Sequence, residues 1–359
     1  MKYKDDWLKS KERFEAYWKG EIVDRCCVSV CAPKNGHSFP PEPVLSSRQD
    51  LDRFWKDLDW RLKRGVDCFE STYYGGDALP IFFINFGPSG MPPFFKSSQY
   101  RFEKDTAWYF PFINDWEKDF PRPDPNSEIR RLTVELAKLA VEKSKGDFLV
   151  DMPDIGGCFD ILGHMRGGEN LMLDIMEDDP VVFRALDVIY AEWFKIMNDI
   201  FPIVDKNNYG GSCIGWLNLW GPGKTAHLQS DLSVMMSPES AKKYVLPELN
   251  MLSNRIDNSL YHLDGCEQIR HLDMLLSIKN LKAIQWTQVA GQPSVLEFIP
   301  ELRRIQKAGK NLLIMVEVEQ FEKVMAQLSS KGLYLLVSGA KTEDDAKSIV
   351  KIAEKLTHE

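Results

Sequence analysis

The feature that most constrains the fold of this chain is a regular alternation of strand and helix patterns from residue 127 to the carboxyl terminus. A helical pattern over 127–145 leads to an apolar strand over 148–153, and helical segments follow through residue 200. Further apolar runs predict strands over 212–216, 259–263, 283–286, 312–318 and 333–337, with a last helix over 343–356. Alternating strands and helices are typical of an α/β protein with a parallel sheet.

The number of strands favours one closed barrel. A buried strand over 27–33 precedes the alternation, and the aromatic region 68–86 leaves room for an eighth. The sequence therefore predicts a single (β/α)8 TIM barrel domain over residues 1–359, with its active site at the carboxyl ends of the strands. No internal repeat, low-complexity segment or linker interrupts the chain.

Two additions to the barrel are predicted. The first twenty residues have aromatic and apolar side chains at helical spacing, which indicates an amino-terminal helical extension that ends at Gly20. Strand-like runs at 100–103 and 107–110 flank a polar turn and predict an inserted β-hairpin. A helix is expected over 50–64.

Composition narrows the class of protein. The chain has 359 residues, is 44% hydrophobic and carries a net charge of −8, which disfavours a nucleic-acid partner bound through phosphates. No run approaches the roughly 18 apolar residues of a membrane span. Its 7 cysteines are odd in number and scattered, as expected of reduced thiols. We therefore expect a cytoplasmic protein without nucleic-acid or membrane partners.

The run Tyr261–Cys266 carries the most chemistry. It ends a predicted strand, and strand alternation points His262 and Asp264 to the same side. An imidazole and a carboxylate so placed can clamp a metal or act as an acid/base pair.

Other predicted strands also end in polar side chains. These are Asp151, Asp154, Trp216, Asn218, Gln285, Trp286, Glu317 and Glu319. A histidine, an aspartate and a glutamate can hold Zn²⁺ and leave a position open for substrate. We expect His262, Asp264 and Glu317 as ligands, with Glu319 or Cys266 as alternatives to Glu317. Helix capping and loop hydrogen bonds are the alternative role of these groups.

From about Arg13 onward the chain resembles the uroporphyrinogen decarboxylase superfamily, and within it the corrinoid-dependent methyltransferase branch. The matching stretches are Gly75–Pro80, Ser230–Ser233, Ser237–Glu239, Leu246–Pro247, Tyr261–Gly265 and Ala283–Thr287. The resemblance implies the same (β/α)8 barrel.

The departures from the family pattern are informative. The arginines with which the decarboxylases bind porphyrinogen carboxylates are absent from Val30–Gly36, which disfavours that activity. His262 matches the zinc-binding histidine of the methyltransferases. Asp264 stands in place of a cysteine, and the segment 315–319 supplies carboxylates in place of a second. Carboxylates make the metal harder, which favours a methyl donor with an oxygen or nitrogen leaving group.

The resemblance therefore implies a zinc-dependent methyltransferase that moves a methyl group between a small methoxy or methylamine compound and the cobalamin of a separate corrinoid protein. Asp77, Asp231 and His262 are the expected catalytic residues, and Tyr73, Tyr74, Trp216, Gln285 and Trp286 are expected to bind substrate. A metal-free decarboxylase of a small acid and a non-catalytic corrinoid-complex subunit are the alternatives. Each of these three candidate functions is compatible with a homodimer.

Overall fold

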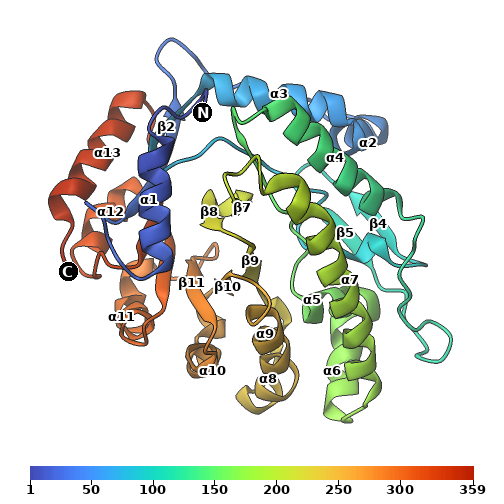
Figure 1. Cartoon of the computed structure of the whole chain (residues 1–359). Coiled ribbons are helices and arrows are strands. Elements are labelled where there is room, and N and C mark those ends of the chain that lie inside the picture. The colour runs from blue at the N-terminus through green and yellow to red at the C-terminus, as the bar shows by residue number, and fades with distance from the viewer.

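A seven-stranded sheet forms the centre of the molecule. The computed structural model describes residues 1–359 (Figure 1), and its main sheet has the order β2-β1-β13-β12-β11-β10-β9. Its strands are β1 (Cys27–Pro33), β2 (Thr72–Gly76), β9 (Thr225–Leu228), β10 (Asn258–Asp264), β11 (Leu281–Thr287), β12 (Asn311–Glu317) and β13 (Leu333–Ser338). All neighbours are parallel except β2, which is antiparallel to β1 at the sheet edge.

Three strand pairs lie outside this sheet. β3 (Ile81–Phe82) and β6 (Leu149–Val150) are parallel, whereas β4 (Gln99–Phe102) with β5 (Ala107–Phe110), and β7 (Gly211–Ile214) with β8 (Leu219–Pro222), are antiparallel. No ladder joins β3 and β6 to the main sheet. The α/β class is therefore confirmed, and closure into a complete barrel stays a prediction.

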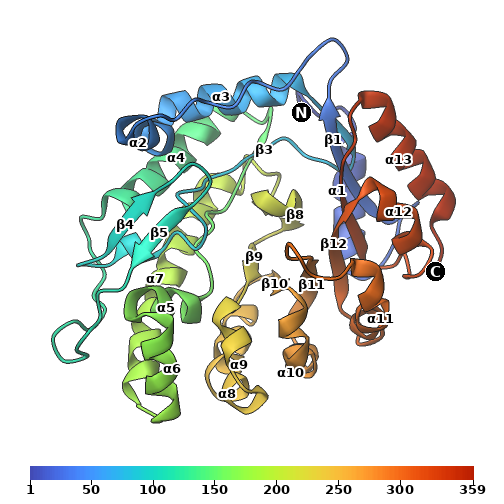
Figure 2. The ribbon, with the colours of Figure 1, turned by 180° about the vertical axis from the view of Figure 1, so that it is seen from behind.

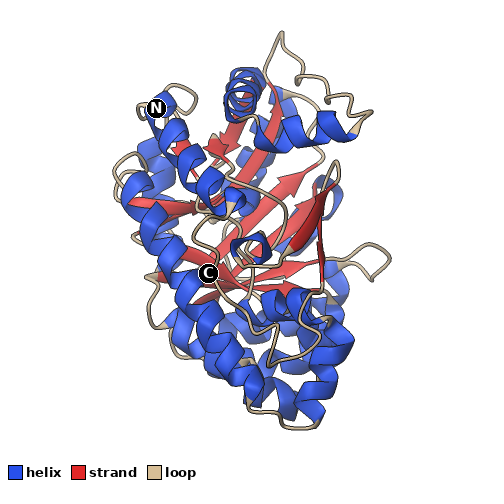
Figure 3. Ribbon diagram, turned by 90° about the vertical axis from the view of Figure 1, so that its right-hand side faces the viewer, coloured by secondary structure: helices blue, strands red, loops and turns tan.

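Helices lie outside the strands (Figure 3). They are α1 (Trp7–Trp18), α2 (Arg48–Lys56), α3 (Leu58–Ser71), α4 (Glu128–Ser144), α5 (Cys158–Arg166), α6 (Gly168–Met176), α7 (Val181–Val204), α8 (Pro238–Tyr244), α9 (Leu246–Ser253), α10 (Leu272–Ser277), α11 (Ile299–Lys307), α12 (Val318–Met325) and α13 (Glu343–Leu356). Short 3₁₀ turns are η1 (Pro92–Phe94), η2 (Gly215–Leu217), η3 (Asp231–Met235), η4 (Cys266–His271) and η5 (Val295–Phe298). No helix is both long and apolar enough to cross a membrane.

The two predicted additions are confirmed. Helix α1 provides the amino-terminal extension, and β4 and β5 form the inserted hairpin, which contacts α2 and α5 (Figure 2).

The helix expected over 50–64 is divided in two. Asp57 has an extended backbone that ends α2, and its side chain accepts a hydrogen bond from the amide of Trp60 at the start of α3.

One predicted strand forms but has the wrong place in the predicted barrel. The strand predicted over 212–216 is present as β7 (Gly211–Ile214), but it pairs antiparallel with β8 as a hairpin and does not join the parallel sheet. The parallel neighbour of β10 is instead β9, only four residues long, which the sequence pattern placed in a loop. The position of β9 beside β10 matters for the candidate site, because Asp231 follows β9 in the chain.

Candidate metal centre

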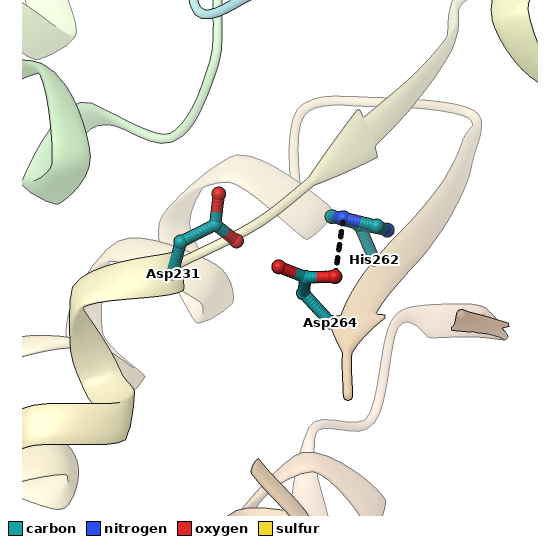
Figure 4. A group of neighbouring side chains, drawn as sticks. All are labelled: Asp231, His262 and Asp264. Atoms are coloured by element: carbon teal, nitrogen blue, oxygen red, sulfur yellow. Dashed lines mark ion pairs between the residues drawn. The ribbon is translucent and has the colours of Figure 1, made fainter. Parts of the chain in front are cut away.

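Three side chains meet at the carboxyl ends of β9 and β10. His262 and Asp264 lie on the last residues of β10, and Asp231 begins η3 just after β9. One ligand atom of each lies within 4.8 Å of the others. Figure 4 shows the three side chains pointing toward one another, with His262 Nε2 3.8 Å from Asp264 Oδ1. The predicted placement of His262 and Asp264 on one side of a strand is what brings them together.

The imidazole of His262 is held in one tautomer. Its Nδ1 lies 2.5 Å from Oε1 of Gln285, on the neighbouring strand β11, and a carbonyl oxygen can only accept. Gln285 in turn donates its Nε2 hydrogen to Thr287 Oγ1. His262 Nε2 therefore carries the free lone pair, as a metal ligand or proton acceptor requires.

Asp231 is held by two neighbours. Its Oδ2 accepts a hydrogen bond from Gln229 Nε2 at 3.0 Å, and its backbone amide donates to Asp160 Oδ2 at 2.9 Å. Asp160 lies near the start of α5, which approaches Gln229 so closely that a Cβ on Gly157 would lie 2.1 Å from the Gln229 carbonyl oxygen. Glycine at 157 is therefore required for α5 to hold η3 in place.

The electrostatics of the cluster favour a bound cation. Burial, together with the charge of Asp264, raises the pKa of Asp231 to about 6. Burial lowers the pKa of His262, so its imidazole is neutral near pH 7. Two close carboxylates and a neutral imidazole leave negative charge unbalanced, and a divalent cation would offset it.

The donor set fits zinc. Catalytic zinc sites use nitrogen and carboxylate oxygen donors from three protein residues and keep one position open. The Oδ1 atom of Asp231 is buried and has no hydrogen-bond partner, as expected of an atom placed to bind an ion. Gln285 and Gln229 supply the outer contacts that orient such ligands.

A small hollow lies beside the cluster. It is lined by Asp151, Asp154, Trp216 and His227 among others. His227 Nε2 lies 3.4 Å from Asp154 Oδ1, and the indole ring of Trp216 stands edge-on to both His227 and His262, with ring centroids 5.5 and 5.1 Å apart. Trp216 therefore lines the hollow and lies against His262, and its role in binding substrate stays a prediction.

The third member of the cluster is not the residue expected as the third ligand. Glu317 ends β12, two strands along the sheet from β10, and its exposed side chain does not join the cluster. Neither Glu319 nor Cys266 joins it. Asp231 takes the third place instead, because the unrecognised strand β9 delivers it beside β10.

Three of the predicted substrate-binding residues lie away from the cluster. Tyr73 and Tyr74 lie on β2, at the sheet edge opposite β9, where Lys347 covers the Tyr73 ring. Trp286 is only 1% exposed and packs on Phe298, so it belongs to the core and not to a pocket wall. The alternation of β11 that points Gln285 at His262 turns Trp286 outward.

Asp77 is also separate from the cluster. It is fully buried, and its carboxylate accepts hydrogen bonds from Arg13 Nη1 at 3.2 Å, Arg25 Nη1 at 2.5 Å and the Val28 amide at 3.0 Å. This network ties α1 to the start of β1 and to the end of β2. Its geometry fits a structural role, and a catalytic role for Asp77 stays a prediction.

Sequence reasoning missed Gln229, His227 and Asp160. His227 and Gln229 precede Asp231 by four and two residues, so an alternating polar pattern, His227-Gln229-Asp231, was present at a strand end. Asp160 carried no signal in the sequence, because only the packing of α5 brings it to η3.

The comparisons with known proteins address the fold. No protein-family model matches this sequence, and no curated protein matches it. Among solved structures, a methyltransferase from Methanosarcina mazei is similar to this chain with a TM-score of 0.58 and 11% sequence identity, over 96% of this chain and 98% of that chain. A likeness at this identity shows the fold alone: the chain shares the α/β fold of that structure over nearly its whole length.

Proposed function

We propose that this protein is a zinc-dependent methyltransferase that moves a methyl group between a small methoxy or methylamine compound and the cobalamin of a corrinoid partner protein. The observation that carries the proposal is the Asp231, His262 and Asp264 cluster, with the His262 lone pair directed into it by Gln285. The fold shared with a methyltransferase supports the same conclusion. The proposal includes closure of the strands into a (β/α)8 barrel.

His262, Asp231 and Asp264 would hold the zinc ion. The bound ion would polarise the oxygen or nitrogen that carries the methyl group and so make it a better leaving group. When the bond to the methyl carbon breaks, its electron pair stays on that heteroatom, while the methyl group passes to Co(I).

The chain's own residues position and protect this reaction. Gln285 and Gln229 orient two of the ligands, and Trp216 lies against His262 and His227, where its ring helps to exclude water. His227, which pairs with Asp154, can carry the proton that the leaving heteroatom needs.

The decarboxylase alternative has less support. A small acid needs a cation to offset its carboxylate, and the carboxylates of the site pair only with histidines and not with lysine or arginine. The corrinoid-binding subunit remains a possible outcome of the test below.

Zinc content and methyl transfer test the proposal together. Purified wild-type protein is expected to hold about one zinc per chain and to methylate Co(I)-corrinoid with at least one donor from a panel of methoxy and methylamine compounds. His262→Ala is expected to lose both properties. His37→Ala changes an exposed histidine and is expected to keep both.

Failure has two forms. Absence of zinc after reconstitution would contradict the metal centre. Zinc without methylation of Co(I) by any donor would contradict the methyltransferase and favour a binding subunit.

A further inference from the structure

A second hollow, with two arginines in its wall, lies beside α2 and α3. It has a volume of about 440 Å³, within the range of about 300–1,000 Å³ that small-molecule sites occupy. Its walls come from these two helices, the loop that follows β3 and the turn between β4 and β5 (Figure 2). None of its lining residues belongs to the metal cluster or to the small hollow beside that cluster.

Arg61 and Arg64 differ from the other arginines that are shielded from solvent. Each of the others forms an ion pair with a carboxylate; they are Arg13, Arg25, Arg130 and Arg166. Arg61 and Arg64 are half-buried, line the hollow and have no carboxylate partner. Burial lowers the pKa of Arg61 to about 10, so its guanidinium stays charged near pH 7. A charge withdrawn from water without a counter-ion is costly, and a bound anion would offset that cost.

The guanidinium of Arg61 keeps donors available for such an anion. Its Nη1 donates to the Trp55 carbonyl oxygen at 3.1 Å and its Nη2 to the Asn85 carbonyl oxygen at 2.7 Å. Its Nε and the second hydrogen on each Nη donate to no protein atom. Nε and a neighbouring Nη together present the parallel pair of donors that binds a carboxylate. Arg64 lies one turn further along α3, on the same face of the helix, and donates to the Pro41 carbonyl oxygen at 2.9 Å.

Aromatic rings form much of the remaining wall. The half-buried rings of Phe54, Trp60 and Phe83 line the hollow. The ring centroids of Phe54 and Trp60 are 5.6 Å apart, and the Arg64 guanidinium lies 5.9 Å from the Trp60 ring. A flat aromatic body packs well on such rings and beside a guanidinium. The wall therefore suits an organic acid with an aromatic ring better than an inorganic anion.

The other charged residues of the hollow limit the charge of the ligand. Lys104 pairs with Glu42, so its charge is already offset. Asp105 lines the hollow and forms no ion pair. Set against Asp105, the two arginines leave an excess of positive charge that suits a monoanion, whereas a dianion such as phosphate is repelled more strongly by the Asp105 carboxylate.

We propose that this hollow binds a small aromatic carboxylate. The carboxylate of the ligand pairs with Arg61 and Arg64, and its ring packs on Phe54 and Trp60. This is a second site, separate from the metal cluster, and it does not depend on the proposed methyl transfer.

Calorimetric titration with benzoate tests the site. Zinc is first removed by chelation, because a carboxylate also binds zinc. Benzamide, acetate and phosphate are titrated at the same ionic strength. Benzoate is expected to bind saturably and at least about ten-fold more tightly than each of the three, which corresponds to about 1.4 kcal/mol. Equal binding of benzamide would show that the arginines add nothing, and equal binding of acetate or phosphate that the rings add nothing; either result, or no saturable binding of benzoate, would overturn the proposal.

Arginine variants locate the binding. Arg61→Gln and Arg64→Gln are each expected to weaken benzoate binding at least about ten-fold, whereas Arg184→Gln, on an exposed arginine of α7, is expected to leave it unchanged. His262→Ala is also expected to keep the binding, because the hollow shares no residue with the metal cluster. Unchanged binding in a folded Arg64→Gln protein, or lost binding in a folded His262→Ala protein, would overturn the proposal.

Two features keep the outcome clear. Arg61→Gln removes the contacts of Arg61 with Trp55 and Asn85, so if that variant does not fold, Arg64→Gln decides, since Arg64 makes a single hydrogen bond to the chain. Methyl transfer without benzoate binding would reject this site alone, and benzoate binding without zinc or methyl transfer would reject the proposed function alone.

Discussion

Replacing Asp77 by alanine is expected to unfold the protein more easily, because it leaves a buried arginine without its counter-ion. Arg25 is 2% exposed, and its Nη1 is shared between Asp77 at 2.5 Å and the Cys26 carbonyl at 2.8 Å. The substitution affects Arg13 less, since this guanidinium keeps two hydrogen bonds of 2.6 Å to Asp24. Removing one partner of a buried ion pair costs about 3–5 kcal/mol.

Urea denaturation followed by fluorescence measures the effect. With an m-value of about 3 kcal/mol/M, the expected loss lowers the unfolding midpoint by about 1–1.7 M. Asp24→Ala is the matched control, because Asp24 is half exposed and its ion pair contributes about 1 kcal/mol or less. The double variant Asp77→Ala/Arg25→Met is expected to recover part of the loss.

Two results would refute this reasoning. The structural role fails if Asp77→Ala costs less than about 1 kcal/mol, or if the effects of Asp77→Ala and Arg25→Met simply add. A folded Asp77→Ala protein with normal stability and no methyl transfer would instead restore the prediction that Asp77 is catalytic.

Three further predictions concern the centre and the core. Gln285→Leu is expected to lower zinc affinity about 10–100-fold in a chelator competition, because His262 loses the acceptor that fixes its tautomer; unchanged affinity would reject that role. Trp286→Ala is expected to cost about 3–5 kcal/mol of stability without loss of zinc, and zinc loss in the folded variant would place the ring at the site after all. Burial raises the pKa of Glu248 from 4.5 to about 8. The folded state therefore keeps a proton that the unfolded state releases. The contribution of this carboxyl group to the free energy of unfolding is fully present below pH 4.5 and is lost as pH rises toward about 8, by up to about 1.4 kcal/mol per pH unit. Glu248→Gln should flatten this slope in unfolding measured across that range, and an unchanged slope would contradict it.

The fold could be predicted where the periodicity was long. Strands of six or seven residues such as β10, β11, β12 and β13 have apolar runs that the sequence displays openly. Strand β9 has four residues and contains His227, so it lacks such a run and the sequence pattern predicts a loop there. The hairpin strand β7 does have a buried apolar run, which predicts a strand. Such a short run does not reveal whether the partner strand is parallel or antiparallel, so the place of β7 in the parallel sheet was predicted wrongly.

The site could be predicted where it depended on one strand alone. The alternation of β10 placed His262 and Asp264 together without any knowledge of the rest of the fold. The third member of the cluster depended on which strand lies next to β10: the sequence suggested Glu317 at the end of β12, whereas the fold brings Asp231 from the end of β9. Contacts between elements distant in sequence, such as Asp160 with η3, have no local pattern from which to infer them.

The misread segment also explains how the site is enclosed. Because β7 turns back on β8 as a hairpin, the turn η2 projects Trp216 against His262 and His227, which a strand continuing in the parallel sheet would not do. The same turn places the Gly215 amide on Asp151, where a Cβ at 215 would lie 2.5 Å from the Asp151 carboxylate. One hairpin therefore supplies the aromatic wall beside His262 and fixes a carboxylate of the hollow, so the enclosure of the site depends on this local departure from regular alternation.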